Sequence, residues 1–333
     1  MADLTTSYLG LTLKNPIIVG SSGLTDSVDK IKKLAAHGAG AVVLKSIFEE
    51  EITHEYDRIV AEEGPKRYKD EFLDYLDYRI REQNLEKYAD LIREAKKEVD
   101  IPVIASVNCA SRHEWTNFAK EIEDAGADAL EVNMFVLPTN MAKTPAENEK
   151  LYFDVAAALK EKIRIPISFK ISYYFSNLAY TIQKLSESGI DGMVLFNRYY
   201  SPDFDIDKME ITSGNVLSNP QEMTNTLRWI AIMANRVKCD ITASTGIHDG
   251  SDVIKQLLAG ANAVQVVSTL YSNGSEKLQN MLKDIKKWMI NHNFDSIEDF
   301  RGKLSQSKSV NPSMYERVQF MKYFSDRDKK VKA

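Results

Sequence analysis

Short apolar runs alternate with longer amphipathic segments along most of the chain. Four of these runs follow a glycine and a small residue, which is typical of a helix end that turns tightly into a strand: 38–44, 126–130, 189–195 and 260–264. Four further apolar runs precede them, at 16–19, 102–105, 166–169 and 240–243. Each of the four begins about 20 to 24 residues before its glycine, which is enough for one strand, one loop and one helix.

The eight runs predict eight parallel strands. Apolar and polar residues do not alternate within them, which indicates strands that are covered on both faces. No strand is followed by the Gly-x-Gly-x-x-Gly motif that marks an open dinucleotide-binding sheet. The pattern therefore predicts an α/β fold, a closed (β/α)₈ or TIM barrel, and an open doubly wound sheet is the alternative.

Two connections are longer than a simple crossover needs. The first follows the second strand, from Ile47 to Asp100, and includes an expected helix from Asn84 to Val99. The second follows the sixth strand, from Arg198 to Asn219, and precedes a helix expected from Gln221 to Val237. Both insertions follow the carboxyl end of a strand, where barrels build active sites and lids.

The two expected parts of the chain are a barrel over residues 1–304 and a short C-terminal extension over residues 305–333. We expect the extension to pack on the barrel or to form an oligomer contact. A last barrel helix is expected from about Glu276.

Composition narrows the class of protein. With 333 residues, 44% hydrophobic and 27% charged, the chain has the balance of a globular enzyme, and its net charge of −5 offers no basic footprint for nucleic acid. Its two cysteines lack Cys-x-x-Cys spacing, so neither a disulfide scaffold nor a metal site is expected. There is no run of 18 apolar residues and no signal-peptide pattern, so we expect a cytoplasmic protein that does not enter a membrane.

Every predicted strand ends in a polar residue, and the carboxyl ends of barrel strands converge on one face. Lys45 and Lys170 lie inside apolar runs, where a charge is costly to bury unless it is paired or binds an anion. The alternative to a functional role is that each lysine extends along the apolar surface until its charge reaches solvent. For the asparagines, the alternative is that they cap turns at the strand ends. The other polar or turn residues at the strand ends are Ser21, Ser22, Ser46, Asn108, Asn133, Asn197, Ser244, Thr245, Gly246, Ser268 and Thr269.

The ends of the seventh and eighth strands favour a phosphate. Ser244–Ile247 and Val267–Leu270 would present backbone N–H groups and hydroxyls to one point. Loops at this place in a barrel are its usual phosphate site. A phosphorylated ligand or cofactor is therefore expected.

Several ordered motifs together resemble the dihydroorotate dehydrogenase family over almost the whole chain. They are Asn15–Pro16, Ser21–Gly23, Leu44–Ser46, Glu131–Asn133, Phe169–Lys170, Asn197, Thr245–Ile247 and residues 296–304. The resemblance implies an FMN-dependent oxidoreductase of pyrimidine biosynthesis, which passes a hydride between a C–C bond next to a carbonyl and the flavin. The resemblance also implies a small-molecule substrate, dihydroorotate or a related cyclic compound. A second copy of the chain, in a possible homodimer, is the other partner that it implies.

The resemblance also implies roles for single residues. Lys45 and Lys170 would lie beside FMN, with Lys170 near the ring edge that gains negative charge on reduction. Asn133 and Asn197 would hydrogen-bond the flavin or an orotate-like ring. The remaining expected cofactor contacts are Ser21, Ser22, Ser46, Gly214, Thr245, Gly246, Ser268 and Thr269.

One departure from the family affects the chemistry. Where the family has a loop with a catalytic cysteine or serine, residues 134–140 read Met-Phe-Val-Leu-Pro-Thr-Asn. A general base contributes about 10² to 10⁴ in rate, so we expect weak or absent dihydroorotate oxidation. Thr139, Tyr199 and Tyr200 are the candidate substitutes. A Schiff-base lyase that uses Lys170, and a flavin-binding barrel with reduced or no dihydroorotate activity, stay open as alternatives.

Overall fold

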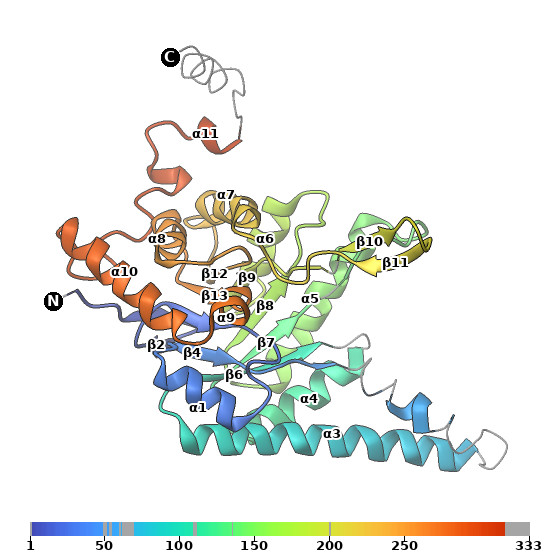
Figure 1. Cartoon of the computed structure of the whole chain (residues 1–333). Helices are drawn as coiled ribbons and strands as arrows, with labels where there is room; N and C mark the ends of the chain where they lie inside the picture. Colours follow the sequence, from blue (N-terminus) through green and yellow to red (C-terminus); the bar gives the residue numbers. More distant parts are fainter. Residues whose placement is uncertain are drawn as a thin grey trace.

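Eight parallel strands form a closed ring in the computed structural model, which describes residues 2–48, 52, 55–59, 61, 70–108, 112–134, 136–199 and 201–316. The ring closes because β4 pairs with β3 on one side and with β6 on the other. The predicted (β/α)₈ barrel is confirmed (Figure 1). In ring order its strands are β3 (Ile17–Val19), β4 (Ala41–Val43), β6 (Val103–Asn108), β7 (Ala129–Asn133), β8 (Ile167–Ile171), β9 (Gly192–Leu195), β12 (Asp240–Ser244) and β13 (Ala263–Val266).

Helices follow the strands and form the outer layer of the barrel (Figure 1). They are α1 (Val28–Ala36), α3 (Asp70–Glu98), α4 (Arg112–Asp124), α5 (Pro145–Lys162), α6 (Leu178–Ser186), α7 (Met223–Met233), α8 (Gly250–Ala259), α9 (Ser268–Asn273) and α10 (Lys277–Asn291). The last helix begins within one residue of its expected start.

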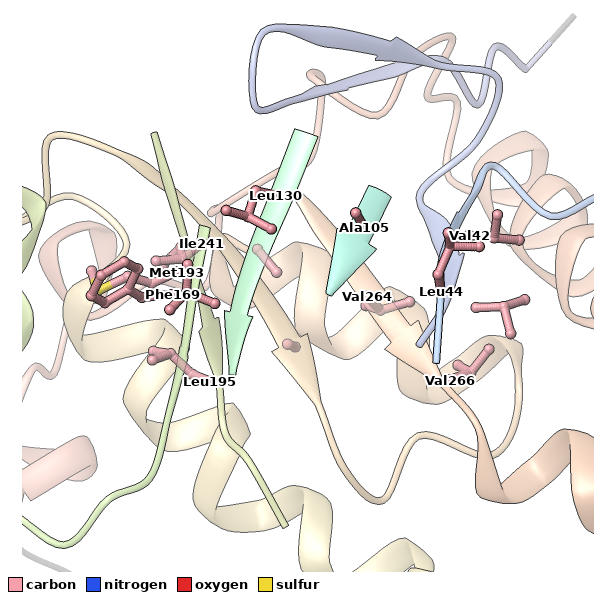
Figure 2. Close-up of a cluster of buried hydrophobic side chains, with 14 of the residues drawn as sticks. Val42, Leu44, Ala105, Leu130, Phe169, Met193, Leu195, Ile241, Val264 and Val266 are labelled. Carbon is pink, nitrogen blue, oxygen red and sulfur yellow. The ribbon is translucent and has the colours of Figure 1, made fainter. Parts of the chain in front are cut away.

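In β3, β4, β6, β7 and β13, alternate residues belong to two different apolar sets. Leu130, Phe169 and Met193 are among those packed between strands and helices, as Figure 2 shows. Ala129 and Ile104 belong instead to a smaller set at the amino end of the barrel interior. Because both faces of each strand are buried, the strands lack the apolar–polar alternation of a half-exposed sheet.

An amino-terminal hairpin, which the sequence patterns did not predict, closes the amino end of the barrel. Its strands, β1 (Thr6–Tyr8) and β2 (Leu11–Leu13), are antiparallel. The turn between them buries Leu9 against Gly192, where an added Cβ would collide with the Leu9 side chain. The interior is therefore sealed at this end.

The insertion after β4 differs from its expected form. A short strand, β5 (Ile47–Phe48), pairs with β6, and the following helix begins at Asp70 rather than near Asn84. The chain has no glycine or proline from residue 66 to residue 98, so no residue of either type interrupts the helix in its first turns.

The insertion after β9 contains an antiparallel hairpin, β10 (Pro202–Asp205) and β11 (Glu210–Ser213), which extends away from the barrel (Figure 1). A 3₁₀ turn, η1 (Pro220–Glu222), leads into α7, which ends at Met233, four residues before the expected Val237. Asn219 caps this turn through its side chain.

The described part of the C-terminal extension contains η2 (Gln306–Lys308) and α11 (Ser313–Glu316). The Asn235 amide, just beyond α7, donates hydrogen bonds to the hydroxyls of Ser305 and Ser307 at 3.0 and 2.7 Å. Residues 305–316 thus contact the barrel, whereas residues 317–333 lie outside the described part. Among the described helices, none has the length and apolar character needed to span a bilayer.

The four predicted glycine turns are confirmed. Gly38, Gly126, Gly189 and Gly260 have φ values of 96°, 92°, 90° and 119°, a region that side chains disfavour. Two of them differ in their surroundings. An added Cβ at Gly260 would overlap the Cβ of Ala234, whereas at Gly126 it would meet no described atom within 4 Å.

Substitution of Gly126 and of Gly260 tests whether backbone strain alone or also a collision requires glycine at these turns. We expect Gly126→Ala to lower the free energy of unfolding by about 1–2 kcal/mol, the cost of left-handed backbone alone. Gly260→Ala should cost more, because it adds a collision to the same strain. Urea unfolding followed by circular dichroism compares the two variants, and equal losses would show that the Ala234 contact relaxes without cost.

Candidate functional site

A cavity of about 270 Å³ lies at the carboxyl ends of the barrel strands. It is called the inner cavity here, and six predicted site residues line it: Ser21, Lys170, Asn197, Thr245, Gly246 and Ser268. They come from five different strand ends, which only closure of the barrel brings together. None of the described residues that line this cavity is acidic. The cavity therefore suits a ligand that carries negative charge.

Lys170 extends from β8 into the barrel interior, where two residues hold its ammonium. Its Nζ donates to Gln265 Oε1 at 3.1 Å and lies 3.7 Å from Glu131 Oε1. The Gln265 amide in turn donates to Glu131 Oε2, and only 1% of the Glu131 surface is exposed. This arrangement compensates a buried charge with a buried carboxylate, as a low-dielectric interior requires.

Asn133 and Asn197 are brought together as neighbours. The Asn197 amide nitrogen donates to the Asn133 side-chain oxygen, and both residues are buried. Asn133 pairs in register with Lys170 across β7 and β8. The two amides and the ammonium therefore lie at the same level of the barrel.

A chain of hydroxyls crosses β3, β4 and β6. Ser21 Oγ lies 3.1 Å from Ser46 Oγ, which lies 2.7 Å from Ser106 Oγ. The Ser46 backbone N–H also donates to Ser21 Oγ at 2.9 Å. Lys45 is half-buried at the same strand end, and its backbone N–H donates to the Thr25 carbonyl at 3.3 Å.

The turn after β12 has an unusual backbone. Thr245 and Gly246 have φ values of 78° and 75°. An added Cβ at Gly246 would overlap the Met223 backbone, so glycine is required there. The Gly246 N–H donates to Ser218 Oγ at 3.3 Å, and the Ser218 N–H donates to Ser268 Oγ at 2.9 Å. Ser218 is thus hydrogen-bonded to both of the loops that the sequence predicts as a phosphate-binding site.

Besides Lys45, Ser46 and Asn133, described above, four further expected site residues do not line the inner cavity. The Ser22 hydroxyl donates a hydrogen bond to the Gly20 carbonyl and accepts one from the Leu24 N–H, both within its own turn. Thr269 donates to the His248 carbonyl, and Gly214 lies at the base of the β10–β11 hairpin, bonded to Ser201. Thr139 lines a separate cavity on the outer side of the loop after β7.

Two further cavities adjoin the loop of residues 134–140. The aromatic cavity, about 600 Å³, is lined by Tyr173, Tyr174, Phe196 and Tyr199 and shares Asn197, Arg198 and Thr245 with the inner cavity. The loop cavity, about 300 Å³, is lined by Val136, Thr139, Tyr152 and Tyr174. Phe135 and Tyr200 lie outside the described residues.

Arg198 lines both the inner and the aromatic cavity, and its guanidinium is hydrogen-bonded to neighbouring residues of the protein. Its guanidinium donates to Glu222 at 2.8 Å and to the carbonyls of Val216 and Asn215 at 2.7 Å each. Burial opposes ionisation of Glu222, but the hydrogen bond from Arg198 holds the pKa of this carboxyl below its ordinary value. The pair fixes the chain that returns from the β10–β11 hairpin.

Sequence reasoning missed Glu131, Gln265, Ser218 and the Arg198–Glu222 pair as parts of the site. Glu131 stood in a recognised motif, and a charge within the apolar run 129–132 was the available signal. Gln265 and Ser218 gave no comparable signal. Among the described residues, no group of three or more His, Cys, Asp or Glu side chains is placed to hold a metal.

Comparison with known proteins places this site in a context. The family model described as "Dihydroorotate dehydrogenase" matches residues 3–289. The chain is 28% identical over 306 residues to the dihydroorotate dehydrogenase B (NAD(+)) catalytic subunit of Thermoplasma acidophilum, covering 91% of this chain and 99% of that protein. It is 23% identical over 320 residues to the NAD-dependent dihydropyrimidine dehydrogenase subunit PreA of Escherichia coli K12, covering 90% and 76% respectively.

The buried charge pair generates a prediction about stability. Lys170→Met leaves Glu131 without its cation, so we expect the free energy of unfolding to fall by about 3 kcal/mol or more. Adding Glu131→Gln should recover part of that loss, with a coupling of about 1–3 kcal/mol between the two sites. Urea unfolding of both single variants and the double variant measures this coupling.

The exposed Lys14–Asp100 pair provides the matched control. Its double-mutant cycle should show no measurable coupling, because solvent screens both charges. Additive losses at Glu131 and Lys170 would mean that the two charges are stabilised independently.

Proposed function

Because the chain belongs to the dihydroorotate dehydrogenase family, it is a flavin-dependent oxidoreductase that acts on CH–CH donors, and we propose that it uses FMN. We propose as its substrate a small ring with a C–C bond next to a carbonyl, such as dihydroorotate or a dihydropyrimidine. The relatives named above act on these two kinds of compound. The observation that carries the proposal is the inner cavity, which places the partly buried Lys170 ammonium and the polar turn of Thr245 and Gly246 in one lining.

The residues of the inner cavity fit a phosphorylated flavin. Thr245 and Gly246 form a turn with positive φ values, and backbone N–H groups in turns are a common way to bind anions. The Ser218 and Ser268 hydroxyls lie in the same wall. We propose that these four residues hold the phosphate and that Ser21 supports the cofactor from β3.

The buried polar residues fit the ring. We propose that Lys170 faces the ring edge that becomes negative on reduction, with Asn133 and Asn197 as hydrogen-bonding groups beside it. The flavin, when bound, supplies the hydride acceptor or donor. Lys170 supplies a fixed positive charge in a low-dielectric interior, where a charge acts more strongly than in water.

The lyase alternative is not favoured by the geometry. A lysine that attacks a carbonyl must be a neutral amine. The Glu131 carboxylate, 3.7 Å from Nζ, stabilises the ammonium instead. A barrel that binds flavin with reduced or no dihydroorotate activity stays an outcome of the tests below.

Cofactor choice tests the phosphate site. We expect apoprotein to bind FMN at least about tenfold more tightly than riboflavin, a difference of about 1.4 kcal/mol, because only FMN carries the anion. Fluorescence titration with FMN, riboflavin and FAD measures the three affinities. Ser218→Ala with Ser268→Ala should narrow the gap by weakening FMN alone. Equal affinities for FMN and riboflavin in the unaltered protein, or a preference for FAD, would reject the phosphate assignment.

The charge of Lys170 predicts a redox shift. Lys170→Gln removes a charge-assisted hydrogen bond to the reduced ring, about 1.5–3 kcal/mol, so the two-electron midpoint potential should fall by roughly 30–60 mV. Potentiometric titration of the flavin absorbance measures the shift. Lys160→Gln, at a surface site, is the control and should leave the potential in place. An unchanged potential in Lys170→Gln would remove this lysine from the flavin edge.

A further inference from the structure

The loop after β7 lacks a thiol, but a tyrosine from another strand end reaches it. The Tyr199 hydroxyl, which follows β9, donates a hydrogen bond to the Val136 carbonyl at 2.8 Å. Val136 belongs to the segment of residues 134–140, where the sequence resemblance implied a catalytic cysteine or serine that this chain lacks. The phenol is therefore anchored to the loop that lacks its own proton donor.

Tyr199 is also placed toward the expected substrate. Its ring lines the aromatic cavity, which shares Asn197 and Thr245 with the inner cavity. Tyr174 packs against it edge to face, with ring centroids 5.3 Å apart. These contacts fix the ring in one orientation beside the place where a flat substrate would meet the flavin.

Behind Tyr199 lies a second buried phenol. Burial raises the pKa values of the Tyr199 and Tyr152 hydroxyls, and the hydroxyl of Ser172, which is fully buried after β8, opposes that rise at both phenols and therefore lies near both. Tyr152 lines the loop cavity on the other side. The order Tyr199, Ser172, Tyr152 thus connects the aromatic cavity with the loop cavity through hydroxyl groups.

We propose that Tyr199 is the catalytic proton donor of this protein and that Ser172 and Tyr152 return the proton from the loop cavity. This inference rests on the flavin-dependent function proposed above. The substrate class is a planar ring with a C=C bond conjugated to a carbonyl, and the reaction direction is reduction of that bond.

Atoms and electrons balance in this reduction. The reduced flavin, when bound, would supply a hydride, which is one hydrogen with two electrons, for the carbon farther from the carbonyl. The Tyr199 hydroxyl gives its proton to the adjacent carbon, so the C=C bond becomes a C–C bond and the phenol becomes a phenolate. Ser172 then passes a proton to Tyr199 and takes one from Tyr152, which is reprotonated by water.

The protonated form of Tyr199 suits this direction. Burial, more than any other cause, raises the pKa of its hydroxyl above the ordinary value; the neighbouring phenols of Tyr174 and Tyr173 add to this rise, and Ser172 opposes it. A phenol is protonated at neutral pH at its ordinary pKa and at a raised one, so Tyr199 holds a proton that it can donate and cannot act as a base there. Thr139 is a weaker candidate because it lines the loop cavity and not the aromatic cavity.

The decisive experiment separates proton delivery from electron transfer. FMN-loaded protein is photoreduced without oxygen and mixed in a stopped-flow instrument with orotate, uracil or ferricyanide. Ferricyanide takes electrons and needs no proton at carbon. In Tyr199→Phe we expect reoxidation by the reactive ring to slow by about 10²-fold or more, with the ferricyanide rate unchanged. Tyr180→Phe, which removes an exposed phenol of α6, is the matched control.

Binding is measured in the same variants. Titration of the oxidised flavin spectrum with the same ring should give a dissociation constant within about threefold of the unaltered protein, which places the loss in chemistry. Equal ring reoxidation rates in Tyr199→Phe and the unaltered protein would overturn Tyr199 as donor and leave the proposed function standing. Failure of both rings to reoxidise the unaltered protein would overturn the proposed substrate class, and this inference with it.

A variant of Tyr152 tests the proposed return of the proton through Ser172. Tyr152→Phe keeps the ring that packs against Phe175 but removes the hydroxyl. Single-turnover reoxidation should stay within about twofold, because Tyr199 already carries its proton, while steady-state turnover with excess dithionite should slow. Unaltered steady-state turnover would reject the relay but not the donor.

Discussion

A buried positive charge is the constraint around which the barrel interior is organised. Lys170 extends from β8 into the ring of strands, below the inner cavity that it lines, and Glu131 and Gln265 hold its ammonium there. These three residues come from three strands that meet only in the closed ring. Glu131 and Lys170 lie on the paired strands β7 and β8, but Gln265 lies on β13, so only the closed ring brings the amide that bonds both of them into place.

The same constraint explains how polar and apolar layers divide the interior. The amino end is filled by Leu9, Ile104 and their apolar neighbours. Toward the carboxyl end the inward residues become Glu131, Lys170 and Gln265. Polar chemistry is thus confined to the face where the long loops gather, and that face can change its loops without disturbing the sealed end.

The sequence predicted the features that depend on local chain behaviour. The glycine turns at 38, 126, 189 and 260 follow from backbone geometry, and Lys170 and Asn133 follow from polar residues at the ends of apolar runs. It missed the contacts that join distant segments. Gln265 and Glu131 are 134 residues apart, and the Ser218 hydroxyl meets Gly246 only because the returning insertion passes beneath that turn. The expectation of weak dihydroorotate oxidation stays a prediction.

The amino-terminal hairpin has a consequence for the order in which the molecule assembles. The Leu9 backbone N–H donates a hydrogen bond to the Asp240 carboxylate, and the Thr6 hydroxyl donates to the Asn262 carbonyl. The partners of Leu9 and Thr6 thus follow them in the chain by 231 and 256 residues and are synthesised much later. Until then Tyr8 and Leu9 are apolar groups without a place to bury, so the growing chain depends on its last strands to cover its first ones.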